Sequence, residues 1–299
     1  MSPGDRLFVF GCGYSASAFV SRLDPQNLAG VTTRSPDKVQ AFAARGWKPL
    51  LFGGEGSDLA PIDTALAETT HLLISIAPGE AGDPVLSAFR QTLLERMPHL
   101  AWIGYLSTVG VYGDHGGAWV DETTPLKPVS QRSVDRVAAE GAWSAIAATR
   151  AVPLAILRLS GIYGPGRNAF VNLAEGKARR LVKPGQVFNR IHVDDIAGAL
   201  RLLADGRIGG VFNVTDDEPA PPQDVVEHAA RLVGTEVPPE LDFDTATLSP
   251  MARSFYGENK RVSNARMKRT GYTFSYPTYR EALAALIGDY DQSASQKPR

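Results

Sequence analysis

A short glycine-containing segment near residue 10 constrains the fold of this chain more than any other stretch. The apolar run Leu7–Phe10 is followed by Gly-x-Gly-x-x-Ala, formed by Gly11, Gly13 and Ala16, and then by a helical pattern of small and apolar residues. This order predicts a strand, a tight turn and a helix start. The first glycine allows the turn, the second lets a pyrophosphate approach the backbone, and the alanine lets the helix lie close to the strand. The segment therefore predicts a dinucleotide site, with a glycine turn that binds nothing as the alternative.

The rest of the first half of the chain alternates predicted strands with predicted helices. Further strands are predicted from apolar runs at 30–33, 47–52, 71–77, 101–106, 154–159 and 211–214. Such alternation is typical of a parallel sheet with helices on both faces. We therefore expect an α/β fold, a doubly wound parallel (Rossmann) sheet, with strand order 3-2-1-4-5-6-7.

The rhythm changes beyond residue 160, where 161–166 resembles a loop and 168–180 a helix. A composition shift at 219–222 suggests a further boundary. The predicted domains are a dinucleotide-binding Rossmann domain (1–165 plus 190–217), a smaller C-terminal substrate lobe over the carboxyl ends of the strands (166–189 plus 218–290) and a disordered tail (291–299).

Composition excludes several functional classes. The 299 residues carry a formal net charge of -1, which indicates neither nucleic acid nor an anionic membrane as partner. No apolar run is long enough for a transmembrane helix, and residues 1–5 do not resemble a secretory signal, so we expect a cytoplasmic location. Cys12 is the single cysteine, which excludes an internal disulfide and a cysteine-based zinc site. Histidines and carboxylates do not occur at metal-ligand spacing, so no metal is expected.

Three later motifs, in order and spacing, carry a resemblance to a known family. They are S-T-V-G-V-Y-G at Ser107–Gly113, R-L-S-G-I-Y-G-P-G-R at Arg158–Arg167, and H-V-D-D at His192–Asp195. The chain resembles the extended short-chain dehydrogenase/reductase family, the NAD(P)-dependent epimerases and dehydratases, over about its whole length. The resemblance implies a Rossmann fold and an NAD(P)-dependent oxidoreductase or epimerase.

The chain departs from that family at two places. Its glycine motif is closer to that of ordinary dinucleotide folds than to the family's G-x-x-G-x-x-G. The family's catalytic Tyr-x-x-x-Lys is also missing: with Glu140 fixing the register, Arg132 stands at the Tyr position and Arg136 at the Lys position. No tyrosine lies between Tyr112 and Tyr163, so the chain looks most like the atypical branch that lacks this residue.

The two arginines allow two interpretations. A guanidinium stays protonated at any useful pH, so Arg132 cannot be the acid or base, but its fork of donors can orient an anionic substrate group. Arg136 can replace the lysine at the nicotinamide ribose. The alternative is that both are exposed helix residues, with Arg136 paired to Glu140 at i,i+4.

Thr108 stands at the family's catalytic Ser/Thr position, at the end of a predicted strand where α/β sheets bind ligands. Its hydroxyl is expected to hold a substrate oxygen, or alternatively only to cap the strand end. Ser107 is the second candidate at this place. His115, on a glycine-rich loop, is a candidate acid or base, with a solvated loop histidine as the alternative.

The residue after the second strand of such folds distinguishes the two nicotinamide cofactors. Here the strand ends in Arg34 and Ser35, with no acid before Asp37, which favours NADP over NAD because arginine pairs with the 2′-phosphate. Arg34 as a solvated residue is the alternative. The expected cofactor-binding residues are Gly11, Cys12, Gly13, Tyr14, Ser15, Arg34, Ser35, Ala77 and Thr108.

Two functions remain open on the sequence. One is an NAD(P)-dependent epimerase/dehydratase-family oxidoreductase acting on a small polar, sugar-like molecule without the usual tyrosine. The other is a non-catalytic sensor or regulatory protein that binds NADP(H). We expect a small-molecule substrate and neither nucleic acid nor a membrane as partner; a homodimer is left open.

Overall fold

The computed structural model describes residues 1–53, 58–248, 253 and 255–290. The chain divides into two compact units by its internal contacts. Unit 1 is Met1–Val111, Pro128–Arg158 and Ile196–Phe212; unit 2 is Tyr112–Lys127, Leu159–Asp195 and Asn213–Arg299. The predicted cofactor and substrate domains remain predictions, because contacts alone do not say what a unit binds. The predicted tail at 291–299 lies outside the described residues.

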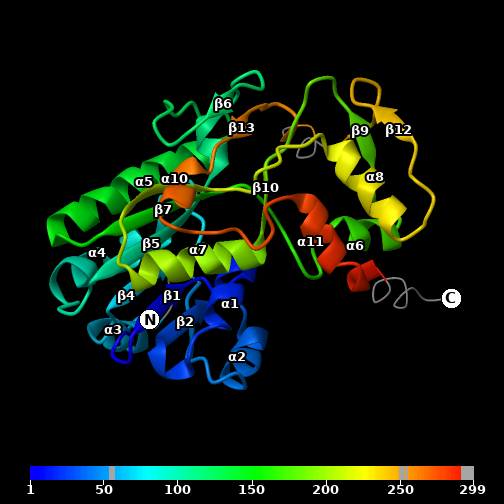
Figure 1. Ribbon diagram of the computed structural model, residues 1–299. Coiled ribbons are helices and arrows are strands. Elements are labelled where there is room, and N and C mark those ends of the chain that lie inside the picture. The colour runs from blue at the N-terminus through cyan, green and yellow to red at the C-terminus, as the bar shows by residue number, and fades with distance from the viewer. Residues whose placement is uncertain (54–57, 249–252, 254, 291–299) are drawn as a thin grey trace. The chain divides into compact units, whose positions relative to one another are not determined.

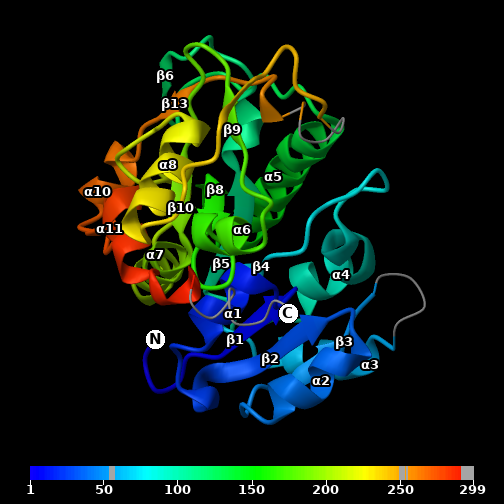
Figure 2. The same ribbon diagram turned by 90° about the vertical axis from the view of Figure 1, so that its right-hand side faces the viewer.

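A seven-stranded parallel sheet forms the centre of the fold (Figures 1 and 2). Its strands, in spatial order, are β11 (Gly210–Val214), β7 (Leu154–Leu159), β5 (Trp102–Thr108), β4 (His71–Ile74), β1 (Leu7–Phe10), β2 (Leu28–Thr33) and β3 (Pro49–Leu51). The predicted order 3-2-1-4-5-6-7 is confirmed. The order reverses between β1 and β4, and in doubly wound sheets ligands bind at such a point.

Burial on both faces explains why these segments form strands. All four residues of β1 are fully buried, as are those of β4. On one face Phe8, Phe10 and Tyr105 pack with helices α3 (Ala60–Ala67), α4 (Pro84–Glu95) and α5 (Gln131–Arg150). Continuous apolar runs are what a parallel sheet covered on both sides requires.

Unit 1 also contains α1 (Tyr14–Val20), η1 (Pro25–Asn27), α2 (Pro36–Ala43) and most of α7 (Val193–Asp205). The start of α4 is capped by Asp83, whose carboxylate accepts hydrogen bonds from the amides of Val85 and Leu86. Ser35 stands at the N-cap of α2 but makes no side-chain cap hydrogen bond. No helix of the described chain is long and apolar enough to cross a membrane.

Unit 2 combines three two-stranded parallel sheets with short helices. The strand pairs are β6 (Trp119–Val120) with β13 (Arg261–Val262), β8 (Gly161–Tyr163) with β10 (Arg190–His192), and β9 (Arg180–Val182) with β12 (Glu240–Asp242). The helices are α6 (Ala169–Ala174), α8 (Pro222–Leu232), α10 (Ala265–Arg269) and α11 (Tyr279–Ala285), and η2 (Val109–Tyr112) links the units in sequence. Phe170, Ala229 and Tyr279 form one core where α6, α8 and α11 meet.

Two predictions for this part of the chain were wrong. Residues 161–163 form β8, not a loop, because their backbone pairs with β10, about thirty residues further along the chain. The helix predicted over 168–180 ends at Ala174, and Gly176 follows with φ at +70°, a conformation that ends helices.

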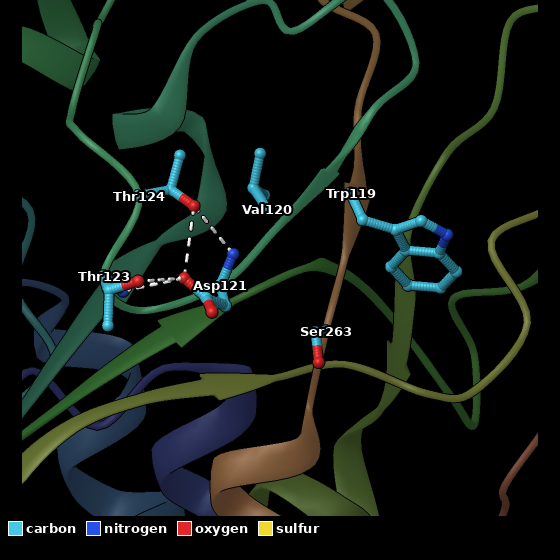
Figure 3. Close-up of a pocket in the computed structure, with 6 residues that line it drawn as sticks. All are labelled: Trp119, Val120, Asp121, Thr123, Thr124 and Ser263. Carbon is cyan, nitrogen blue, oxygen red and sulfur yellow. Dashed lines mark hydrogen bonds between the residues drawn. The ribbon is translucent and has the colours of Figure 1, made fainter.

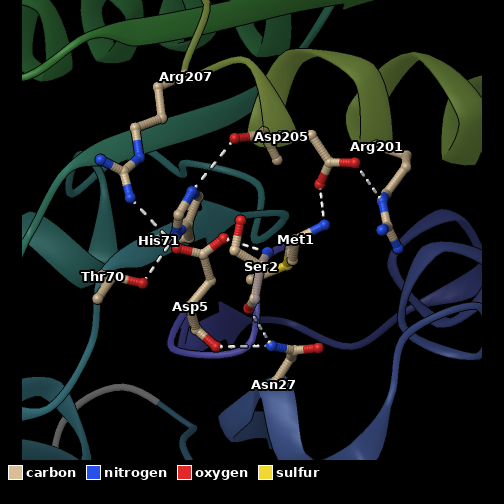
Figure 4. Close-up of polar contacts among 10 residues, drawn as sticks. Met1, Ser2, Asp5, Asn27, Thr70, His71, Arg201, Asp205 and Arg207 are labelled. Carbon is tan, nitrogen blue, oxygen red and sulfur yellow. Dashed lines mark hydrogen bonds and ion pairs between the residues drawn. The ribbon is translucent and has the colours of Figure 1, made fainter.

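A buried histidine links three separate segments of unit 1 (Figure 4). His71 begins β4 and is fully buried; its Nε2 lies 3.2 Å from the carbonyl of Ala204 on α7, and its Nδ1 lies 2.8 Å from the Thr70 hydroxyl. The carboxylate of Asp5 lies 3.9 Å from Nδ1 and also pairs with Arg207 at 3.3 Å. Burial is the main cause that lowers the pKa of His71 below its ordinary value of 6.5.

This histidine makes stability depend on pH. Below pH 6.5 the unfolded chain takes up a proton at His71 that the folded chain does not, so the free energy of unfolding falls as pH falls. We expect H71Q to reduce the slope of unfolding free energy between about pH 7 and about pH 5, measured by urea denaturation. The exposed control H99Q keeps the wild-type slope. An unchanged slope in H71Q would contradict this role.

Candidate functional site

The glycine turn after β1 is held by hydrogen bonds to β2. The amide of Gly11 donates to the Thr32 hydroxyl at 2.8 Å, and the amide of Cys12 donates to the Thr32 carbonyl at 2.8 Å. Gly11 has φ at +85°, and a Cβ there would lie 2.6 Å from Ile76, so only glycine fits. Gly13, at the N-cap of α1, has open space where a side chain would stand, and no side chain caps the helix. The turn is thus rigid on its sheet side and accessible at Gly13.

The other predicted cofactor residues lie in unit 1 at the ends of neighbouring strands or at the start of α1. Tyr14 begins α1 and is partly exposed, whereas Ser15 is buried. Arg34 follows β2 directly and is exposed, with Ser35 half-buried beside it. Ala77, which follows β4, is exposed.

Cys12 is buried in this turn and behaves as a filler. Its Sγ lies 3.4 Å from the Ser17 hydroxyl, and burial raises the pKa of the Cys12 thiol above its ordinary value. A thiol held protonated is a poor nucleophile.

The end of β5 brings Thr108 against the start of α5. The Thr108 hydroxyl accepts a hydrogen bond of 3.1 Å from the amide of Gly110, which leaves its own proton for donation. A Cβ on Gly110 would lie 2.8 Å from Ser133 Oγ, on the first turn of α5, and 3.4 Å from Thr108 Oγ1. Thr108 is half-exposed at the carboxyl end of β5, near the N-terminal turn of α5.

A buried ion pair contacts Ser107, the residue directly before Thr108. Arg158 on β7 donates to both carboxylate oxygens of Glu140 on α5, at 2.8 Å and 3.2 Å, and Ser107 on β5 donates to the same carboxylate at 2.5 Å. All three residues are 5% exposed. The Ser107 hydroxyl is thus engaged with Glu140, and Thr108 is the neighbouring hydroxyl with a proton to offer.

Arg136 is anchored to β5 and not to Glu140. Its guanidinium donates to the Leu106 carbonyl at 2.5 Å and to the Tyr105 hydroxyl at 3.2 Å. Burial raises the pKa of Tyr105 to about 12, so that phenol stays neutral. The alternative in which Arg136 pairs with Glu140 is not what the structure shows. Arg132, one turn earlier on α5, is exposed.

The Glu140–Arg158 pair is the part of this region that the sequence analysis missed. On the sequence, Glu140 fixed a register and was the alternative partner of Arg136, and Arg158 was only the first residue of a motif. A signal was present, because an arginine inside the otherwise apolar strand at 154–159 requires a buried partner.

His115, the loop candidate, lies in unit 2. Its Nε2 lies 3.1 Å from the Tyr112 carbonyl, and its amide donates to the carbonyl of Asn259. Lys260, buried in the same unit, donates to the Gly113 carbonyl at 2.7 Å. The loop that holds His115 is therefore tied to the segment before β13.

An open hollow in unit 2 is lined by Trp119, Val120, Asp121, Thr123, Thr124 and Ser263 (Figure 3). Hydrogen bonds from Thr123 lower the pKa of Asp121 below its ordinary value. None of the predicted site residues lines this hollow. Within the described residues there is no group of three or more histidines, cysteines or carboxylates that could hold a metal ion.

Residues 85–215 match the family model described as "NAD dependent epimerase/dehydratase family". The matched segment runs from α4 to the end of β11 and contains Thr108, α5 and the buried ion pair. This part of the chain is similar to the NAD-dependent epimerase/dehydratase family. A solved structure of a putative NAD-dependent epimerase/dehydratase from Methylobacillus flagellatus is 27% identical, covers 95% of this chain and 98% of its own, and has a TM-score of 0.71.

Individual proteins are similar to this chain over most of its length. A solved structure of a functionally unknown conserved protein from Silicibacter pomeroyi is 50% identical, covers 95% of this chain and 99% of its own, and has a TM-score of 0.87. The protein YeeZ of Escherichia coli is 28% identical over 269 residues, 80% of this chain and 91% of YeeZ. A GDP-6-deoxy-D-mannose reductase of Pseudomonas aeruginosa is 25% identical over 294 residues, 92% of this chain and 87% of that protein.

The buried ion pair gives a stability prediction. E140Q leaves the Arg158 charge buried and uncompensated, so we expect it to lower the free energy of unfolding by about 3–5 kcal/mol. The double variant E140M/R158M removes both charges and should recover most of that loss, because well-packed apolar groups can replace a buried ion pair. Urea denaturation measures both. If E140Q loses less than about 1 kcal/mol, the pair is not buried as described.

Proposed function

We propose that this protein is an NADP(H)-dependent oxidoreductase that acts on a small polar substrate at the carboxyl end of β5. The observation that carries the proposal is the glycine turn, rigid toward the sheet and open at Gly13, in a chain whose residues 85–215 match the model of an NAD-dependent family. The amides at the start of α1 supply donors for a pyrophosphate there. When bound, the nicotinamide supplies hydride transfer.

Thr108, Arg132 and Arg136 are the side chains proposed to lie around the reacting atoms of the substrate. Thr108 has a hydroxyl proton to donate to a substrate oxygen, and such donors stabilise charge that develops during reaction. Arg136 and Arg132 stand where the family has Lys and Tyr, and neither can take a proton at neutral pH. The acid or base therefore comes from the substrate or from a water held by Thr108.

Cofactor preference is expected to rest on Arg34. Its exposed guanidinium at the end of β2 suits a 2′-phosphate, so calorimetry should show NADPH binding tighter than NADH. We expect R34E to reverse the order, because its carboxylate repels the phosphate and accepts from a ribose hydroxyl. R22E, the same charge change at another exposed arginine of unit 1, should keep the wild-type order. Equal affinities before and after R34E would remove Arg34 from the site.

Turnover distinguishes an enzyme from a protein that only binds the cofactor. T108A should lower the rate of hydride transfer by about ten- to a thousandfold, because the Thr108 hydroxyl is expected to stabilise charge that develops during the reaction. T149A, on the exposed face of α5, is the matched control and should leave the rate unchanged. NADPH binding without turnover on a broad panel of sugars, ketones and acids would support a sensor instead. A confirmed activity that T108A does not change would exclude Thr108 from the site.

A further inference from the structure

Arg136 is a half-buried cation whose described partners do not neutralise it. Its hydrogen bonds go to the Leu106 carbonyl and the Tyr105 hydroxyl, which are both uncharged. The carboxylate one turn further along α5, Glu140, is already shared between Arg158 and Ser107. Charges withdrawn from water generally have an opposite charge beside them, and within the described part of the chain Arg136 lacks one.

A second guanidinium stands one turn nearer the start of the same helix. Residues four apart lie on one helix face, so Arg132 shares the face of Arg136. Among the ion pairs of the described residues none involves Arg132, which is exposed. Arg132 and Arg136 are therefore two guanidinium groups on one face of α5 without a carboxylate partner among the described residues. One turn further along the same face, Glu140 is buried against β5.

The start of α5 also lies beside the Thr108 hydroxyl. A Cβ added to Gly110 would meet Ser133 Oγ at 2.8 Å and Thr108 Oγ1 at 3.4 Å, so glycine is what allows this close approach. Arg132 directly precedes Ser133. The helix turn that carries the exposed guanidinium is thus packed against the strand end proposed to hold the reacting group.

We propose that Arg132 and Arg136 bind a carboxylate of the substrate, so that the substrate class is a hydroxy or oxo acid, with its reacting oxygen at Thr108. This rests on the proposed function for the role of Thr108. A guanidinium fork matches a carboxylate with two parallel hydrogen bonds, and a neutral sugar leaves both forks without a counterpart. A substrate without an acidic group has no carboxylate for the two guanidinium groups to bind.

The test is calorimetric titration of the protein with oxalate, and with oxamide as its planar, uncharged counterpart, both with and without NADPH. Oxalate should bind at least about tenfold more tightly than oxamide. R132M and R136M should each weaken oxalate binding by about tenfold or more. R150M is the matched control, because Arg150 lies on the same helix and, like Arg136, donates to uncharged oxygens, here the carbonyls of Leu94 and Met97.

If R136M does not fold, R136K serves in its place, and it should weaken oxalate binding because lysine keeps the charge and loses the fork. Equal binding of oxalate and oxamide, no oxalate binding up to about 20 mM, or wild-type oxalate affinity in both arginine variants would overturn the proposal. NADPH affinity is measured separately. Oxalate binding that depends on both arginines, in a protein that does not bind NADPH, would support the anion site and overturn the cofactor proposal.

Discussion

The ion pair between Glu140 and Arg158 fixes the carboxyl end of the sheet. It joins α5 to β7 and, through Ser107, to β5, the neighbour of β7 in the sheet. Removing two charges from water is costly, and the cost is offset only where every charge is well bonded. Here both carboxylate oxygens accept from the Arg158 fork and one also accepts from Ser107. This geometry explains how a charged pair is accommodated with each member 5% exposed.

The same pair decides which neighbouring groups remain available for chemistry. It occupies the hydroxyl of Ser107, and it takes the carboxylate that Arg136 would otherwise meet four residues along its helix. Thr108 and Arg136 are the groups left with unused bonding capacity at this end of β5. A buried structural interaction thus shapes a candidate site to which it contributes no reacting atom.

The conformation of the glycine turn after β1, the proposed pyrophosphate site, is fixed by a steric constraint. Gly11 lies so close to Ile76, on the segment after β4, that no side chain fits, and Thr32 holds the next amide through its carbonyl. The turn is fixed by two neighbouring strands of the sheet before any ligand arrives. A site that is already ordered loses little conformational entropy on binding, which is the physical advantage of building it on strand ends.

Much of the fold was predictable because its determinants are local. Each strand of the central sheet is a short apolar run, and the alternation with helices implies a parallel sheet whose connections are right-handed, which leaves few possible orders. The strand β8 was missed because it is only three residues long, is followed directly by Gly-Pro-Gly at 164–166, and pairs with a strand about thirty residues away. The helix after it was predicted too long because the periodic pattern continues past the glycine that ends it.

The sequence by itself determined the strand, glycine turn and helix at residues 7–20, and it placed arginines at 132 and 136 in a segment without tyrosine. Only the tertiary structure decided which cation Glu140 meets. Local spacing favours Arg136, which is four residues away on the same helix face. Folding brings Arg158 from β7 instead, because a carboxylate and a guanidinium that are both buried must satisfy each other, whereas Arg136 can reach a backbone carbonyl.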